Sequence, residues 1–149
     1  MKWGGVDRRV SSDEEDVAAS AAEAEVHRAG EEDLPEQVTV GREHLNAGRY
    51  FPAHEAWETA WKQARETADA EFFKGLSQLG AGLVHLLRGN AHGCVRLLRR
   101  GAGRVRGYPP GHQGVDTRGV AEAAERLAAA VERGDVIPGD QARFDPPNV

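Results

Sequence analysis

One group of side chains in the sequence could hold a metal ion or move a proton. His54 and Glu58 are four residues apart, so on a helix an imidazole and a carboxylate would reach the same point. His85 lies further along the chain, and two histidines with a glutamate could hold a divalent transition metal, the one cofactor that the sequence suggests. Glu55 and Gln78 complete the polar cluster. We therefore predict a ligand-binding or structural cluster here, with His54, Glu58 and His85 as candidate metal ligands.

Two further interpretations of this cluster stay open. A buried hydrogen-bonded network between two helices is the favoured one, and general acid–base catalysis is the least supported. The zinc-peptidase signature His-Glu-x-x-His would need a histidine where Glu58 stands, which removes the peptidase interpretation. Catalysis also needs a cleft and a tuned pKa, and the sequence displays neither. No catalytic residue is assigned, and a non-catalytic role is favoured without the question being decided.

An arginine-rich stretch is a second candidate site, for nucleic acid or another polyanion. Its members are Arg88, Arg96, Arg99, Arg100, Arg104 and Arg106. Arginine binds phosphate through paired hydrogen bonds, and several arginines on one helix could follow a nucleic-acid backbone. However, the net charge is −5, and the stretch between Glu71 and Asp116 has no acidic residue, so its cations could pair with the acidic ends of the chain. We expect a solvated or self-paired surface, with polyanion binding as the alternative.

Helical periodicity predicts the elements that position these residues. Apolar residues recur at helical spacing, and no segment alternates with the period of two that a half-buried strand requires. The predicted helices cover about residues 35–48, 52–66, 70–88, 91–106 and 116–134. The fold class is therefore all-α, a compact bundle of about five helices.

The second and third predicted helices carry most of the predicted core. Trp57 and Trp61 share the inward face of the second helix, and replacing either with alanine should cost about 3–5 kcal/mol if it is fully buried. The third helix is apolar over much of its circumference, so it should be buried. Its glycines Gly75 and Gly82 lie on nearly the same side, where they would let a neighbouring backbone come close.

Composition divides the chain into three segments. Residues 1–33 hold too few large apolar groups to offset the entropy of ordering, so we expect an acidic extension outside the core. Ser12 and Glu15 fit a capping box at the start of a solvated helix in that extension. Residues 34–134 should form the bundle domain, and the Pro-rich tail of residues 135–149 should lie along its surface.

The composition points to a cytoplasmic protein with no membrane partner. The apolar runs of this 149-residue chain are too short to span a bilayer, and the first residues lack the apolar stretch of a signal peptide. Cys94 is the single cysteine, so an intrachain disulfide is excluded.

Three short motifs resemble a known family. They are AHEAWETAW at 53–61, FKGLSQL at 73–79 and HLLRGN at 85–90. In this order they resemble the domain-of-unknown-function 309 family, whose members are small all-helical proteins of bacteria and archaea. The resemblance covers about residues 41–106. It implies an all-helical fold and no established activity.

The function predicted from these patterns is a non-catalytic helical interaction or assembly module. A tryptophan-containing bundle without cleft chemistry is more often a binding module than an enzyme. The partner would be a second copy of the chain, giving a homo-oligomer, or an unidentified protein, with nucleic acid less favoured. The alternatives are a metal- or small-ligand-binding protein that uses the His/Glu cluster, and weak polyanion binding through the arginines.

Overall fold

A computed structural model describes residues 34–144, which form five α-helices and one short 3₁₀ helix without any strand. The elements are α4 (Leu34–Asn46), α5 (Tyr50–Gln63), α6 (Ala70–Leu87), α7 (Ala91–Arg106), η1 (His112–Gly114) and α8 (Thr117–Arg133). The all-α prediction is confirmed, and the helix ends fall within three residues of their predicted positions. The solvated helix predicted after Ser12 lies outside the described residues.

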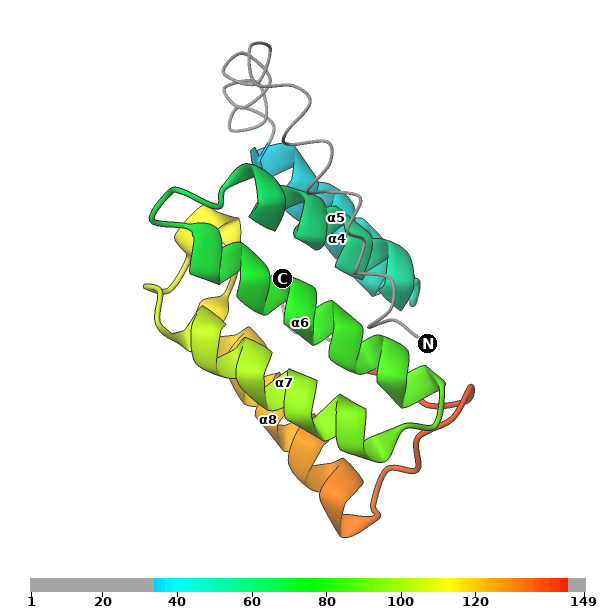
Figure 1. The fold of residues 1–149 in the computed structure, drawn as a ribbon. Coiled ribbons are helices and arrows are strands. Elements are labelled where there is room, and N and C mark those ends of the chain that lie inside the picture. Colours follow the sequence, from blue (N-terminus) through cyan, green and yellow to red (C-terminus); the bar gives the residue numbers. More distant parts are fainter. Residues whose placement is uncertain (1–33, 145–149) are drawn as a thin grey trace.

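Consecutive helices pack against each other along the chain. Figure 1 shows α5, α6 and α7 side by side in one layer, with α4 behind α5 and α8 behind α7. The short turn after α4 makes α4 and α5 an antiparallel hairpin, so the start of α4 lies at the same end of the bundle as the end of α5. Because α6 lies between α5 and α7, it is covered on two sides. This agrees with the prediction, made from its largely apolar circumference, that this helix is buried.

Of the two tryptophans of α5, Trp57 lies in the core and Trp61 does not. Trp57 is 1% exposed and packs with Phe72, Phe73 and Leu76 in the main apolar cluster. Trp61 is only half-buried, and the ammonium of Lys74 lies 5.7 Å from its ring centroid. The predicted inward position is therefore confirmed for Trp57, whereas Trp61 reaches the edge of the α5–α6 contact.

Glycines on two sides of α6 let both neighbouring helices come close. A Cβ added at Gly75 would lie 3.1 Å from the carbonyl oxygen of Gly101, and one added at Gly82 would lie 3.0 Å from Leu98. The predicted close approach at Gly75 and Gly82 is thus present, and the neighbour is α7. On the other side of α6, a Cβ at Gly80 would lie 2.8 Å from the Cα of His54 in α5.

Local capping signals fix two helix starts and one helix end. The Asp116 carboxylate accepts a hydrogen bond from the backbone N–H of Gly119 at 3.0 Å, which confirms the predicted start of α8. Asn90 accepts in the same way from Gly93 at the start of α7. Gly134 ends α8 with a φ of 82°, the left-handed conformation that glycine adopts at little cost.

The C-terminal tail contacts the core rather than only the surface. The backbone N–H of Gly139 donates to the carbonyl of Leu86 at 2.8 Å, and that of Phe144 donates to the Tyr50 hydroxyl at 3.1 Å. Phe144 also helps to line a small apolar cavity of about 10 Å³ beside Trp57. Packing at the Tyr50 end of α5 thus places part of the tail against the core.

Within residues 34–144, each helix is too short or too polar to cross a lipid bilayer.

Candidate functional site

The structure places His54 in a row of three polar side chains between α5 and α6. His54 Nδ1 lies 3.0 Å from the Ser77 hydroxyl and 2.9 Å from the Ser77 carbonyl oxygen. On the other side of the ring, Nε2 lies 3.5 Å from the Glu58 carboxylate, one helical turn further along α5. His54 and Ser77 are buried, while the Glu58 side chain is 20% exposed. The row therefore runs from the interior of the bundle to its surface.

The two contacts of His54 with Ser77 require different tautomers. With the proton on Nε2, the Ser77 hydroxyl donates to Nδ1 and the Nε2–H group faces the Glu58 carboxylate, whereas with the proton on Nδ1 the ring donates to the Ser77 carbonyl oxygen. The order hydroxyl–imidazole–carboxylate is that of a hydrolase triad. However, Ser77 is 6% exposed and lies on the side of α6 packed against α5, so a substrate carbonyl has no route to its oxygen. The geometry makes this row a polar tie that joins α5 to α6.

The other residues of the predicted cluster lie elsewhere. Gln78 accepts a hydrogen bond from Arg104 of α7 at 3.2 Å, and Glu55 is exposed on the outer side of α5. His85 is held at the α6–α7 turn, where Asn90 Nδ2 donates to its Nδ1 at 3.0 Å. Among residues 34–144, no three His, Cys, Asp or Glu side chains form a group that could hold a metal ion. The structure therefore does not bring the predicted ligands His54, Glu58 and His85 together.

The glycine strip of α6 explains this separation. Gln78 and His85 lie next to Gly75 and Gly82 on the helix surface, and that side of α6 packs against α7. The side that packs against α5 is marked by Gly80, and Ser77 lies beside it. Ser77 was missed in the sequence, although its polar side chain in an apolar helix, on the side opposite the glycine strip, was a usable signal.

His85 has an environment that favours its neutral form. Burial lowers its pKa below the usual 6.5, and the nearby positive charges of Arg88 and Arg96 lower it further. A neutral ring can accept at Nδ1, which is what the hydrogen bond from Asn90 requires. His85 therefore braces the capping residue of α7.

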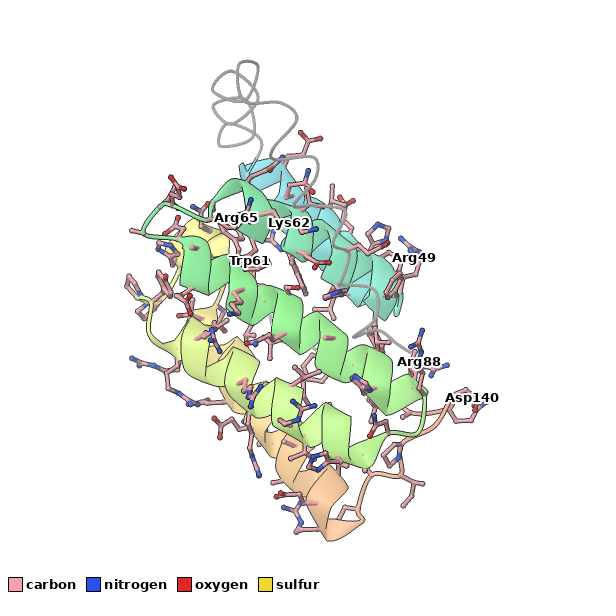
Figure 2. All side chains as sticks on the ribbon, viewed as in Figure 1. Arg49, Trp61, Lys62, Arg65, Arg88 and Asp140 are labelled. Atoms are coloured by element: carbon pink, nitrogen blue, oxygen red, sulfur yellow. The ribbon has the colours of Figure 1, made fainter. Side chains whose placement is uncertain are left out.

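Three of the six arginines are paired with glutamates on other helices. Arg99 makes two hydrogen bonds of 2.9 Å to Glu132, Arg106 makes one of 2.9 Å to Glu125, and Arg104 makes one of 2.7 Å to Glu71. This is the self-pairing predicted for the basic middle of the chain. Arg88 lies at the end of α6, away from these pairs (Figure 2). For Arg96 and Arg100, no ion pair is found within the described part of the chain.

A second polar cluster, which the sequence did not reveal, joins two loops. The Asp69 carboxylate accepts hydrogen bonds of 2.8 Å from His112 Nε2 and from Gln113 Nε2. The Tyr108 hydroxyl donates to the carbonyl of Ala68 at 2.7 Å. Gln113 has a φ of 52°, the one positive value at a non-glycine residue between 34 and 144. The cluster fastens the loop before α6 to the loop before α8, and only the folded chain brings these loops together.

One surface combines aromatic and basic side chains, and we call it the α5–α6 face. It consists of Phe51, Glu58, Trp61, Lys62 and Arg65 from α5, and Lys74 and Arg88 from α6. Figure 2 places Trp61, Lys62 and Arg65 near one end of this face, and Arg88 at the opposite end. Phe51 and Trp61 are half-buried against the core, and Glu58 is the surface end of the polar tie. The face holds four cations and one acid.

Comparison with known families places most of this site in one sequence family. Residues 38–97 match the profile of a family described as a domain of unknown function (DUF309). The match covers less than half of the chain and shows that this region is similar to the DUF309 family. The match confirms the resemblance carried by the three motifs, and it contains His54, Glu58 and Ser77. Among curated proteins and among solved structures, no match to the chain was found.

The DUF309 match separates the two candidate sites. The α5–α6 face and the polar tie lie wholly within it, as does His85. Of the arginine stretch, the match includes only Arg88 and Arg96. The arginines from Arg99 to Arg106, which carry the ion pairs to glutamates, lie beyond it.

Proposed function

We propose that this protein is a non-catalytic interaction module that binds an acidic protein segment on its α5–α6 face. The observation that carries the proposal is the position of Trp61, half-buried between α5 and α6 with Lys62, Arg65 and Lys74 around it. Tryptophan and arginine are the residues most enriched where proteins bind each other tightly. The cations would attract and orient an acidic partner, and the aromatic rings would bury its apolar groups.

The charge distribution supports a protein segment over nucleic acid. A polyanion binder needs several unpaired cations along one path, whereas Arg99, Arg104 and Arg106 are each occupied by a glutamate. On the α5–α6 face, Glu58 lies among the cations and would repel a continuous phosphate backbone. A peptide can place its acids beside the lysines and an apolar group beside Trp61.

The polar tie supports this role indirectly. The contacts of His54 with Ser77 hold α5 and α6 in a fixed register, so the side chains on their shared face keep fixed positions. A preorganised surface loses less entropy on binding than a mobile one. A metal site that uses His54 and Glu58 is less well supported, because the third predicted ligand, His85, already accepts a hydrogen bond from Asn90.

The test is a nuclear magnetic resonance titration of the full chain with two probes. One probe is a synthetic glutamate-rich peptide that carries a phenylalanine, and the other is a short DNA duplex. We expect the peptide to shift amides of the α5–α6 face. The variant K62E/R65E/K74E should lose about tenfold or more in affinity, since exposed charge pairs contribute roughly 0.5 kcal/mol each. The control variant R118E/R126E changes two exposed arginines of α8 and should bind as the wild type does.

Two results would overturn the proposal. One is the absence of peptide binding to any variant. The other is tighter binding of the DNA, with shifts centred on Arg96 and Arg100, which would favour the polyanion alternative. Light scattering on the same samples tests self-association, since a dimer formed through the α5–α6 face would be disrupted by the triple substitution.

A cytoplasmic location fits this role. Cys94 is fully buried, and burial raises the pKa of its thiol to about 11, so it behaves as a small apolar core residue without need of a disulfide.

A further inference from the structure

The charge of the chain is divided between the bundle and the segment that precedes it. Residues 1–33 contain ten acidic and four basic residues, a net charge of −6. Residues 34–144 contain 13 acidic and 15 basic residues, a net charge of +2. The mildly acidic whole therefore consists of a basic folded part joined to a strongly acidic segment.

The connection of the two parts brings the acidic segment to the α5–α6 face. Because α4 and α5 form an antiparallel hairpin, Leu34 lies at the end of the bundle where Lys62 and Arg65 lie (Figure 2). The acids Glu31, Glu32 and Asp33 immediately precede Leu34 in the sequence. Their connection to the bundle keeps them within a few residues' length of those two cations.

The length of the segment also matches the length of the face. The 14 residues of α5 span about 21 Å at 1.5 Å per residue. The run of acids Asp13–Asp16 is separated from Leu34 by the 17 residues 17–33. As a measure of reach, a random coil of that length would have an average end-to-end distance of about 21–25 Å. The acidic run can therefore reach the far end of the face, where Arg88 lies.

We infer that the acidic segment of residues 1–33 binds the α5–α6 face of its own chain, with Asp13–Asp16 toward Arg88 and Glu31–Asp33 toward Lys62 and Arg65. The inference rests on the proposed function, since it assigns the first occupant of that face. Covalent connection gives the segment an effective concentration of about millimolar, so weak charge pairs are sufficient for it to bind. An external acidic partner must displace it, and the segment is thus a built-in competitor.

The contact can be measured with a spin label on the full chain. Ser12→Cys provides a labelling position next to the acidic run, and buried Cys94, with its raised thiol pKa, stays unlabelled in the folded protein. We expect the nitroxide to reduce amide signals of the α5–α6 face and to leave those of Arg118 and Arg126 on α8 unchanged. Raising the salt from 0.1 to 1 M shortens the Debye length from about 10 to about 3 Å and should restore the signals.

Matched variants show whether charge is responsible. The variants K62Q/R65Q/K74Q/R88Q and, in the segment, D13N/E14Q/E15Q/D16N should each restore the signals, whereas R118Q/R126Q should not. Signal loss that is absent, or equal over all helices, would overturn the inference. Signal loss in unlabelled, isotope-enriched protein mixed with spin-labelled protein would also overturn it, because the occupant would then be the segment of a second copy.

A second readout separates this inference from the proposed function. The glutamate-rich peptide should bind D13N/E14Q/E15Q/D16N several-fold more tightly than the wild type, because the competitor has been weakened. If the peptide binds this variant and the wild type equally tightly, the competition is refuted but the proposed peptide-binding role of the α5–α6 face is not. If the peptide binds neither protein, the proposed function itself fails.

Discussion

The substitution Gly80→Ala tests how closely α5 and α6 approach each other. A Cβ at position 80 would lie 2.8 Å from the Cα and 2.9 Å from the Cβ of His54. The obstacle includes the backbone of α5, which cannot rotate away as the end of a long side chain can. To reach an ordinary contact of 3.4 Å, the two helices must move apart by about 0.6 Å.

The magnitude follows from three opposing terms. Forcing an extra methyl group into a packed contact costs about 1–3 kcal/mol. The same movement lengthens the contacts of His54 with Ser77, now 2.9 and 3.0 Å, toward the limit of a hydrogen bond, at a cost of about 1 kcal/mol. Against these, alanine gains about 1 kcal/mol of helix propensity over glycine. The net prediction for Gly80→Ala is a destabilisation of about 1–3 kcal/mol.

The control is the same change at Gly103 in α7, where nothing lies within 4 Å of the added Cβ. Gly103→Ala should therefore gain about 0.5–1 kcal/mol from helix propensity alone. Urea and thermal unfolding, followed by far-ultraviolet circular dichroism, measure both variants, and each 1 kcal/mol should move the melting temperature by about 4 °C. If Gly80→Ala proves as stable as Gly103→Ala, the close approach of α5 and α6 at this position is wrong.

Two further predictions follow from burial and charge. Trp57→Ala should destabilise by about 3–5 kcal/mol and Trp61→Ala by clearly less, because only Trp57 is fully buried; equal losses in urea unfolding would contradict this. For His85, burial and then the charges of Arg88 and Arg96 place the folded-state pKa below 6.5, so the unfolded state binds the proton first. Stability should therefore fall as the pH drops from 6.5 through the folded-state pKa, and His85→Gln should remove that part of the pH dependence. A directly measured imidazole pKa above 6.5 would refute the assignment.

Local signals in the sequence were sufficient to predict the helices and several of their ends. Hydrophobic periodicity depends on one helix at a time, which explains why α6 was recognised as a buried helix. The start of α8 after Asp116 and its end at Gly134 depend on residues adjacent in the chain, and both agree with the helix predicted over residues 116–134. The self-pairing of the arginines was also predicted from charge alone, although their partners were not.

The polar cluster shows what local signals in the sequence could not predict, namely which helices pack against each other. Spacing correctly placed His54 and Glu58 on one side of α5, since that relation lies within a single helix. It also placed Gln78 and His85 beside a glycine strip, but it could not show which neighbour packs against that strip. The neighbour is α7, so the actual partner of His54 is Ser77.

What the sequence by itself determined is therefore the set of helices, the position of each residue around its own helix axis, and the uneven distribution of charge. Tertiary structure alone decided which helix faces which side of α6, and hence that His54 meets Ser77 while Gln78 meets Arg104. It also decided that the loops carrying Asp69 and His112 meet. The physical reason is that helix periodicity fixes angles about one axis, whereas the partner and register of two helices depend on how all of their surfaces fit together.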